Sequence, residues 1–272
     1  MAGDDTLKFN GRQIVTFVNQ KGGVGKTVSV LTIGAWLARM GEKVLLIDGD
    51  PQGNLSIFFK EQLKETALEN DLAALFRKLI KDGEAAGRQR YIQPRVRDNL
   101  DLLPLLHLKL REEFSDNKLA DIALVFSEVV EQYKQDYDWI LLDSSPSNGR
   151  LEKMLITAAE AVFVPLEMQL FSIAGLNHLL NDIRAIAKLA RKNITIECLI
   201  FNKTDRRLKR TREYQELFTN FNVPVYEVHR SEKLAQAIEN NYTPAEYGAA
   251  SPAARDFLNI VQTKMLGSAK NG

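Results

Sequence analysis

Two lysines stand five positions apart in the segment VNQKGGVGKTVS, with three glycines between them. A glycine-rich loop of this kind can curl tightly and present its backbone N–H groups to phosphate oxygens. The second lysine is then placed for the β- and γ-phosphates of a nucleotide, and the threonine hydroxyl that follows it for Mg²⁺. The predicted nucleotide-binding residues of the loop are Lys21, Gly22, Gly23, Val24, Gly25, Lys26, Thr27 and Val28.

Acidic residues follow two later apolar runs. The run KVLLID ends at Asp48 and Asp50 comes just after it, whereas the run DWILLD ends at Asp143. Acids at the carboxyl end of a strand lie where open α/β sheets bind their ligands. An acid that closes an apolar strand, as Asp143 does, is typical of the Walker B position, which holds Mg²⁺.

The elements that must position these residues alternate between strands and helices. The phosphate-binding loop lies between an apolar run and an amphipathic stretch over residues 27–40, and a second such stretch covers 173–190. This alternation predicts a doubly wound, mostly parallel α/β sheet with helices on both faces, of the P-loop NTPase class. We expect one domain over residues 12–266 between flexible tails at 1–11 and 267–272, with 60–98 as its least regular part. The expected strands are RQIVTFVN, KVLLID, LDLLPL, DWILLD, AVFVPL, ITIECLIF and VPVYEV.

The loop departs from the common G-x-x-x-x-G-K-[ST] pattern in an informative way. Gln20 takes the place of the first glycine, and Lys21 is an additional cation. This is a deviant Walker A motif. Together with LLIDGDPQGN it makes the chain resemble the ParA family of partition ATPases, which is related to MinD. The resemblance runs over roughly residues 12–266. It suggests the small ParA type, without an N-terminal helix-turn-helix extension.

The resemblance implies roles for the charged residues. Lys21 would reach across a dimer interface to the nucleotide of the partner subunit, so that ATP and Mg²⁺ hold a sandwich homodimer together. Asp50 would orient the attacking water, and Asp48 would lie near the Mg²⁺ ion. The implied catalytic residues are Lys21, Lys26 and Asp50, and the implied metal-binding residues are Thr27, Asp48 and Asp143.

Two positions differ from the usual family pattern. Val28 stands where relatives often carry a second threonine or serine, so a hydroxyl is lost, although the backbone N–H remains. Ser145 stands after Asp143 where a proline is more usual, which predicts a less rigid loop. Neither difference removes a group that phosphoryl transfer requires.

The tetrapeptide Asn202-Lys203-Thr204-Asp205 allows two interpretations. Asn202 is placed like the asparagine that contacts the base in MinD-like relatives, which bind ATP. The same tetrapeptide is the guanine-binding signature of many GTPases, in which the aspartate accepts from the base. We expect ATP, with GTP as the alternative.

A basic run follows immediately, RRLKRTR, in which five of seven residues are cationic. The formal net charge of the chain is only +1, so these cations create a local field. No aromatic residue interleaves, so contacts to the phosphates of duplex DNA fit better than stacking on single strands. The predicted residues for nonspecific double-stranded DNA are Arg206, Arg207, Lys209, Arg210 and Arg212.

Several classes of protein are excluded or disfavoured. Cys198 is the only cysteine and sits in an apolar run, which indicates a core thiol and excludes an internal disulfide or an iron–sulfur reductase. The three histidines, His107, His178 and His229, have no metal-ligand spacing. The polar N-terminal stretch favours the cytoplasm over a signal peptide.

Two alternatives remain open beside a ParA-like switch that positions a plasmid, chromosome or protein assembly on the nucleoid. A MinD-like membrane switch would need a basic amphipathic C-terminal helix. Phe257, Ile260, Val261 and Leu266 could form its apolar stripe, but the polar face has little basic excess, so we expect packing on the sheet and no stable membrane association. A metabolic P-loop enzyme, similar to dethiobiotin synthetase, would not need Lys21. The ParA resemblance also implies a ParB-like or adaptor partner that stimulates slow hydrolysis.

Overall fold

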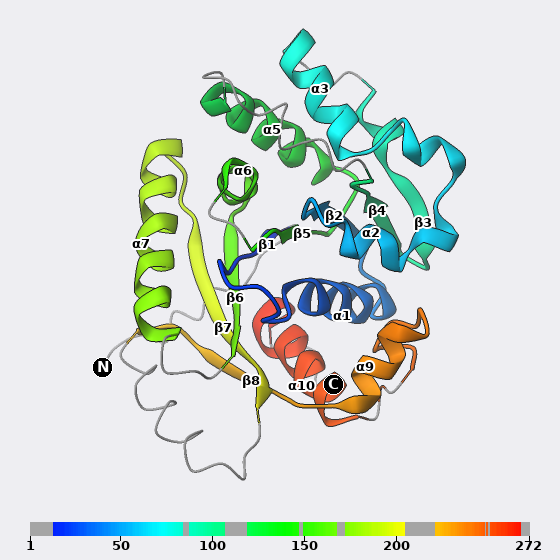
Figure 1. The fold of residues 1–272 in the computed structure, drawn as a ribbon, viewed down its shortest axis with the longest axis vertical. Coiled ribbons are helices and arrows are strands. Elements are labelled where there is room, and N and C mark those ends of the chain that lie inside the picture. The colour runs from blue at the N-terminus through cyan, green and yellow to red at the C-terminus, as the bar shows by residue number, and fades with distance from the viewer. Residues whose placement is uncertain are drawn as a thin grey trace.

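The computed structural model describes residues 13–83, 87–106, 119–146, 149–167, 172–204, 221–247, 249 and 251–267. Its strands form an eight-stranded sheet in the order β3-β4-β2-β5-β1-β6-β7-β8 (Figure 1). Every pair of neighbours is parallel except β3 and β4, which are antiparallel. The strands are β1 Gln13–Phe17, β2 Val44–Gly49, β3 Gln93–Arg97, β4 Leu100–Leu103, β5 Trp139–Ser144, β6 Ala161–Glu167, β7 Thr195–Thr204 and β8 Val225–His229.

Helices cover both faces of the sheet, which confirms the predicted doubly wound α/β class (Figure 1). Helices α1 and α10 pack with one face, and α3, α5, α6 and α7 pack with the other. The α-helices are α1 Lys26–Arg39, α2 Asn54–Phe58, α3 Leu72–Asp82, α5 Leu119–Tyr133, α6 Arg150–Ala158, α7 Ser172–Ala190, α9 Glu232–Glu239 and α10 Pro252–Ile260. Short 3₁₀ turns lie at Lys60–Gln62, Glu65–Leu68 and Arg88–Tyr91, and a π-helical turn at Val261–Met265 continues α10.

The central strands are buried on both sides because helices lie above and below them. All six residues of β2 and all six of β5 are buried, as a parallel sheet with two covered faces requires. Their continuous apolar runs are therefore the sequence signal of a central strand. Cys198 on β7 is likewise fully buried, and burial raises the pKa of its thiol, which confirms the predicted core thiol.

Seven of the eight strands match apolar runs of the sequence, but β3 was not predicted. Its segment QPRVR contains a proline and two arginines, and only two of its five residues are buried. Proline and charge are tolerated in this strand because it lies at the edge of the sheet and pairs with β4 alone.

The C-terminal apolar stripe packs inside the molecule, as predicted. Phe257, Ile260 and Val261 are buried in the core that α1 and α10 share, and Leu266 packs against that core. The stripe is therefore covered by protein in this fold. Among the described residues, no helix combines the length and the apolar character needed to cross a bilayer.

Candidate nucleotide-binding site

The phosphate-binding loop joins the carboxyl end of β1 to α1, whose first residue is Lys26. Gly23 and Gly25 have φ angles of +76° and +93°, a left-handed conformation that favours glycine. A Cβ atom at Gly25 would lie 2.6 Å from Nδ2 of Asn202, so a side chain there would also clash. The loop thus needs glycine for both conformation and space, and the start of α1 directs its N–H groups towards the loop.

The Lys26 side chain is folded back over the loop. Its ammonium donates to the backbone oxygens of Asn19 at 3.0 Å and Lys21 at 3.4 Å, and only 6% of the residue is exposed. Burial lowers the pKa of Lys26, while the carboxylates of Asp143, Asp50 and Glu152 oppose that shift. Lys26 therefore lies among three acids at the phosphate-binding loop.

The sheet register brings two of the predicted acids together. Strands β2 and β5 are neighbours, and Asp48 is the register partner of Asp143. Asp48 is held in place by three donors: the Ser56 N–H at 2.8 Å, the Ser56 hydroxyl at 2.6 Å and the Asp50 N–H at 3.1 Å. Burial still raises the pKa of Asp48 to about 7, because these hydrogen bonds offset only part of the desolvation.

Asp50 lies in the turn after β2 and is 6% exposed. Its carboxylate accepts from the Gln52 N–H at 3.0 Å, and its carbonyl accepts from the Gly53 N–H at 2.8 Å. The turn therefore fixes Asp50 close to Lys26, whose pKa it influences.

Asp143 is fully buried, and neither of its carboxylate oxygens accepts a hydrogen bond of good geometry, although the Thr27 hydroxyl lies close enough to act on it as a donor. Burial and the neighbouring Asp48 raise its pKa, whereas the nearby Thr27 hydroxyl and Lys26 act in the opposite direction. A buried carboxylate without a well-formed hydrogen bond is uncommon in proteins, and a hard cation such as Mg²⁺ takes oxygen ligands of this kind. Asp143, with Thr27 and Asp48 beside it, thus fits a Mg²⁺ ion.

The protein alone does not supply a complete metal cage here. In the described part of the chain, no group of three or more histidine, cysteine or acidic side chains could hold a metal ion. Mg²⁺ is commonly bound by one or two carboxylates together with substrate phosphates. The site therefore fits an ion that arrives with a nucleotide. His178 and His229 belong to no such group, and His107 lies outside the described residues.

Glu152 was not predicted, although it faces the same loop. It lies in the first turn of α6, is 1% exposed, and has no hydrogen-bond partner at either carboxylate oxygen. Burial raises its pKa to about 8, and the charge of Lys26 opposes this shift. An acid in the first turn of a helix is common at exposed sites, so no signal in the sequence distinguished Glu152.

Glu152→Gln is expected to stabilise the protein at alkaline pH. The pKa of Glu152 is raised in the fold, so the native state holds a proton that the unfolded chain releases above its ordinary pKa. Below the ordinary pKa of a glutamate, the contribution of Glu152 to the free energy of unfolding is fully present. This contribution is lost as the pH rises from there towards 8. The glutamine variant lacks this loss, so its advantage should grow between pH 5 and 9 to a few kcal/mol. Urea unfolding at several pH values measures this difference. A pH-independent difference would contradict the assignment.

Asn202 is brought to the phosphate-binding loop. Its amide Nδ2 donates to the backbone oxygen of Val24 at 2.7 Å. The next residue, Lys203, was not predicted to contact this loop, but its ammonium donates to the Gly23 oxygen at 3.0 Å. Asn202 therefore holds the loop through its N–H donor, and the predicted contact with the base stays a prediction. Asp205, on which the GTP alternative depends, lies outside the described residues.

Lys21 lies on the exposed side of the loop, unlike the buried Lys26. The Lys21 N–H donates to the side chain of Asn19 at 2.9 Å. Gln20, which replaces the usual glycine, donates to Asp182 of α7 at 3.1 Å. The structure thus separates the two lysines, because one turns inward over the loop and the other lies at the surface.

The predicted DNA-binding residues Arg206, Arg207, Lys209, Arg210 and Arg212 all lie outside the described residues. They follow directly after β7, which ends at Thr204. The carboxyl end of β7 and the phosphate-binding loop lie at the same end of the sheet, where the parallel strands finish. Thr204, the last described residue before the basic run, therefore lies at the carboxyl end of the sheet.

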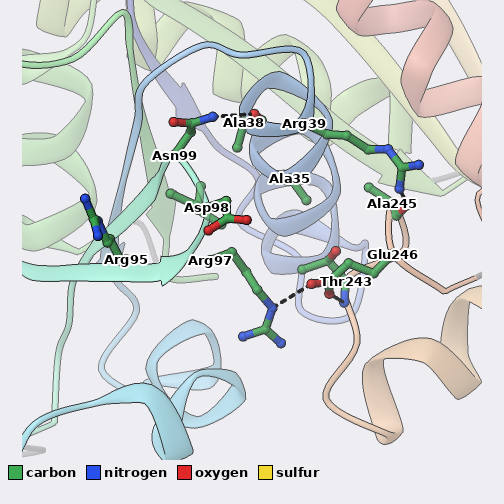
Figure 2. A pocket seen from close by; sticks show the side chains of 11 residues that line it. Ala35, Ala38, Arg39, Arg95, Arg97, Asp98, Asn99, Thr243, Ala245 and Glu246 are labelled. Carbon is green, nitrogen blue, oxygen red and sulfur yellow. Dashed lines mark hydrogen bonds and ion pairs between the residues drawn. The ribbon is translucent and has the colours of Figure 1, made fainter.

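A hollow of about 540 Å³ lies at the opposite end of the sheet, where the parallel strands begin (Figure 2). Its arginines contact neighbouring segments: Arg97 pairs with Glu246 at 2.8 Å, and Arg39 donates to the Ala245 oxygen at 2.6 Å. These contacts join the β3–β4 hairpin and α1 to the segment after α9, so the hollow is separate from the nucleotide site. It is lined by Ala35, Ala38, Arg39, Arg95, Arg97, Asp98, Asn99, Leu100, Thr243, Ala245 and Glu246.

Several known proteins are similar to this chain in sequence. A family model described as an AAA domain matches residues 12–196. The chromosome-partitioning ATPase Soj of Treponema pallidum is 31% identical over 263 residues, which cover 93% of this chain and 96% of the relative. The sporulation initiation inhibitor protein Soj of Bacillus subtilis is 28% identical over 253 residues, or 92% and 97% of the two chains.

A solved structure has the same fold. The ATP complex of a McdA variant from Cyanothece superposes with a TM-score of 0.77 at 19% identity, and the match covers 93% of this chain and 96% of that one. The chain belongs to the ParA family of partition ATPases.

Proposed function

We propose that this chain is an ATP-hydrolysing switch that dimerises with ATP and Mg²⁺, binds double-stranded DNA without sequence preference, and positions a cargo. The cargo is a plasmid, a chromosome region or a protein assembly, and a ParB-like or adaptor partner stimulates the hydrolysis that releases the switch. One observation carries this proposal: the deviant loop presents Lys21 at its surface, while Lys26 and the acids of β2 and β5 gather behind it.

The residues of one subunit divide the work of phosphoryl transfer. The loop N–H groups and Lys26 would bind the phosphates, because the helix end and the ammonium both favour negative charge there. Thr27, Asp48 and Asp143 would hold Mg²⁺, which neutralises charge on the phosphates when bound. Asp50 would accept a hydrogen bond from the attacking water and so orient it. Lys21 of the second subunit would stabilise the charge that develops during transfer.

Dimerisation would link nucleotide state to DNA binding. Two copies of the basic run from 206 to 212 on one dimer act as a bivalent surface, so the dimer should bind DNA far more tightly than a monomer. The contacts are to phosphates, so they fix no sequence. Such binding would place the protein on the nucleoid, in the cytoplasm.

DNA binding is therefore expected to require ATP and to weaken steeply with salt. Each phosphate contact releases counterions, so a protein making 6 to 10 contacts loses roughly 10³- to 10⁵-fold in affinity between 50 and 200 mM salt. Charge reversal to Glu at Arg206, Arg207, Lys209 and Arg210 should abolish retention on random-sequence DNA. A control variant reverses four exposed cations elsewhere, Lys60, Lys64, Arg77 and Lys81, and should retain more of the binding.

Repeating this measurement with different nucleotides separates the competing functions. Asp50→Ala should stay on DNA with ATP, because binding and dimerisation persist while hydrolysis stops. Equal retention with ADP, or binding insensitive to salt, would contradict the switch.

ATP-dependent sedimentation with anionic liposomes in place of DNA would support the MinD-like alternative. Preferential displacement of bound nucleotide by GTP would favour guanine recognition through Asp205, and failure to dimerise with any nucleotide would favour a metabolic P-loop enzyme.

A further inference from the structure

Two consecutive side chains at the end of β7 hold two consecutive carbonyl groups of the phosphate-binding loop. Nδ2 of Asn202 donates to the Val24 oxygen at 2.7 Å, and Nζ of Lys203 donates to the Gly23 oxygen at 3.0 Å. These contacts join segments that are 178 and 180 residues apart in sequence. The end of β7 is therefore a brace for the loop.

The brace acts on the groups that would meet phosphate. In a planar trans peptide unit, the C=O of one residue and the N–H of the next point in opposite directions. Fixing the Gly23 oxygen on one side therefore aims the Val24 N–H to the other side. Fixing the Val24 oxygen does the same for the Gly25 N–H. Loop N–H groups that are already aimed bind an anion without an additional ordering cost.

Lys203 has an unusual backbone conformation at the point where it makes this contact. Its φ is +58°, and the pairing of β7 with β8 shifts register between Phe201 and Thr204. A left-handed conformation costs a non-glycine residue on the order of 1 kcal/mol, and such residues gather where function requires them. Irregularities of this kind in a strand redirect a side chain.

Glu167 directs the ammonium of Lys203. It is the last residue of β6 and the register partner of Asn202, and its Oε1 lies 2.5 Å from Nζ of Lys203. The side chain of Lys203 is 57% exposed, and an exposed ion pair contributes little to the stability of a fold. The hydrogen bond from Lys203 to the Gly23 oxygen is therefore better evidence for a role of Lys203 than its ion pair with Glu167.

We propose that Lys203, directed by Glu167, is a positioning residue that works with Asn202 to preorganise the phosphate-binding loop. This inference rests on the proposed function, because it concerns the same nucleotide site. It also gives the Asn-Lys pair of the tetrapeptide a role that is independent of which base is bound.

The test compares Lys203→Met with a matched control, Arg191→Met. Arg191 is also an exposed cation with a left-handed backbone, at φ +53°, but it lies just past the C-terminal end of α7. Lys203→Met should speed hydrogen exchange of the loop amides without nucleotide and raise the KM for ATP, each by about 10-fold, while kcat falls by a smaller factor. Arg191→Met should change neither. Lys203→Arg should recover part of the loss, and Glu167→Gln should show a smaller effect of the same kind.

The outcomes distinguish this inference from the proposed function. Suppose that Lys26→Ala abolishes ATP binding while Lys203→Met has the wild-type rate of amide hydrogen exchange and the wild-type KM. The proposed role of Lys203 is then wrong, and the ATPase assignment stands. If the wild type does not bind ATP, the proposed function fails, and the exchange of the loop amides still tests the brace. If Lys203→Met does not fold, Glu167→Gln decides, and wild-type exchange and KM in that variant would overturn the proposal.

Discussion

Replacing Asp143 with asparagine is expected to raise the melting temperature of the protein without nucleotide, by roughly 2 to 4 °C for each kcal/mol of stability gained, and to remove its Mg²⁺-dependent ATP binding. The carboxyl is fully buried, and neither oxygen accepts a hydrogen bond of good geometry, although the Thr27 hydroxyl lies nearby. Keeping it inside requires either a buried charge that Lys26 and Thr27 only partly offset, or the uptake of a proton that the unfolded chain does not hold at neutral pH. Asparagine avoids both costs, but its neutral amide is a poor ligand for Mg²⁺.

The measurement is a pair of thermal melts, without ligand and with ATP and Mg²⁺. The wild type should gain stability from Mg²⁺ with ATP, because a ligand that binds only the native state stabilises it. Asp143→Asn should start higher and gain far less. Asp136→Asn makes the same chemical change at an acid whose side chain is 44% exposed, and should affect neither melt. A variant that melts below the wild type without ligand would show that Asp143 stabilises the fold.

Burial of the acids of this site is expected to oppose folding, and a bound cation would reduce that cost. Asp48, Asp143 and Glu152 are all buried, and burial raises the pKa of each. The fold keeps them close together because β2 and β5 are neighbours and α6 follows β5 directly. Lys26 is the opposing charge among them. Such a cluster is expected where a cation and a phosphate chain bind, since active sites are commonly less stable than they could be.

The sequence predicted the elements of the site better than the contacts within it. The loop from Lys21 to Val28 could be located because glycines, a lysine and a threonine recur at a fixed spacing between a strand and a helix. Asp48 and Asp143 could be assigned to strand ends because each closes an apolar run. That these two are register partners depends on the order of strands in the sheet, and no local pattern encodes that order.

The contacts that were missed come from residues distant in the chain. Ser56 binds Asp48 from α2, Glu152 faces Lys26 from α6, and Lys203 reaches Gly23 from β7. Each is an ordinary residue for its own element, so only the tertiary arrangement shows its role. Strand β3 was missed for the opposite reason, because pairing at the edge of the sheet overrides a composition that disfavours strands.

Lys21→Ala is expected to bind ATP but to stay monomeric. Lys26 and the loop N–H groups remain in the variant, so most of the contacts with phosphate within one subunit persist. Lys21 lies at the surface of the loop, and the ParA resemblance implies that its ammonium contacts the nucleotide of a second subunit. A cation in that place would stabilise a dimer only when nucleotide is present. Light scattering with ATP and Mg²⁺ should give the 30.7 kDa mass of the chain for the variant and about twice that for the wild type.

Lys26→Ala provides the contrast that makes this result specific. Lys26 is the inward lysine, close to Asp143 and Asp50, so its loss should abolish nucleotide binding and, as a consequence, dimerisation. The two variants remove the same charge only five positions apart but should fail at different steps. Titration with a fluorescent ATP analogue separates them, since Lys21→Ala should bind within about 10-fold of the wild type and Lys26→Ala should lose at least about 100-fold. An ATP-dependent dimer of Lys21→Ala would mean that Lys21 acts only within its own subunit, and the reason for a second lysine would then lie in the loop itself.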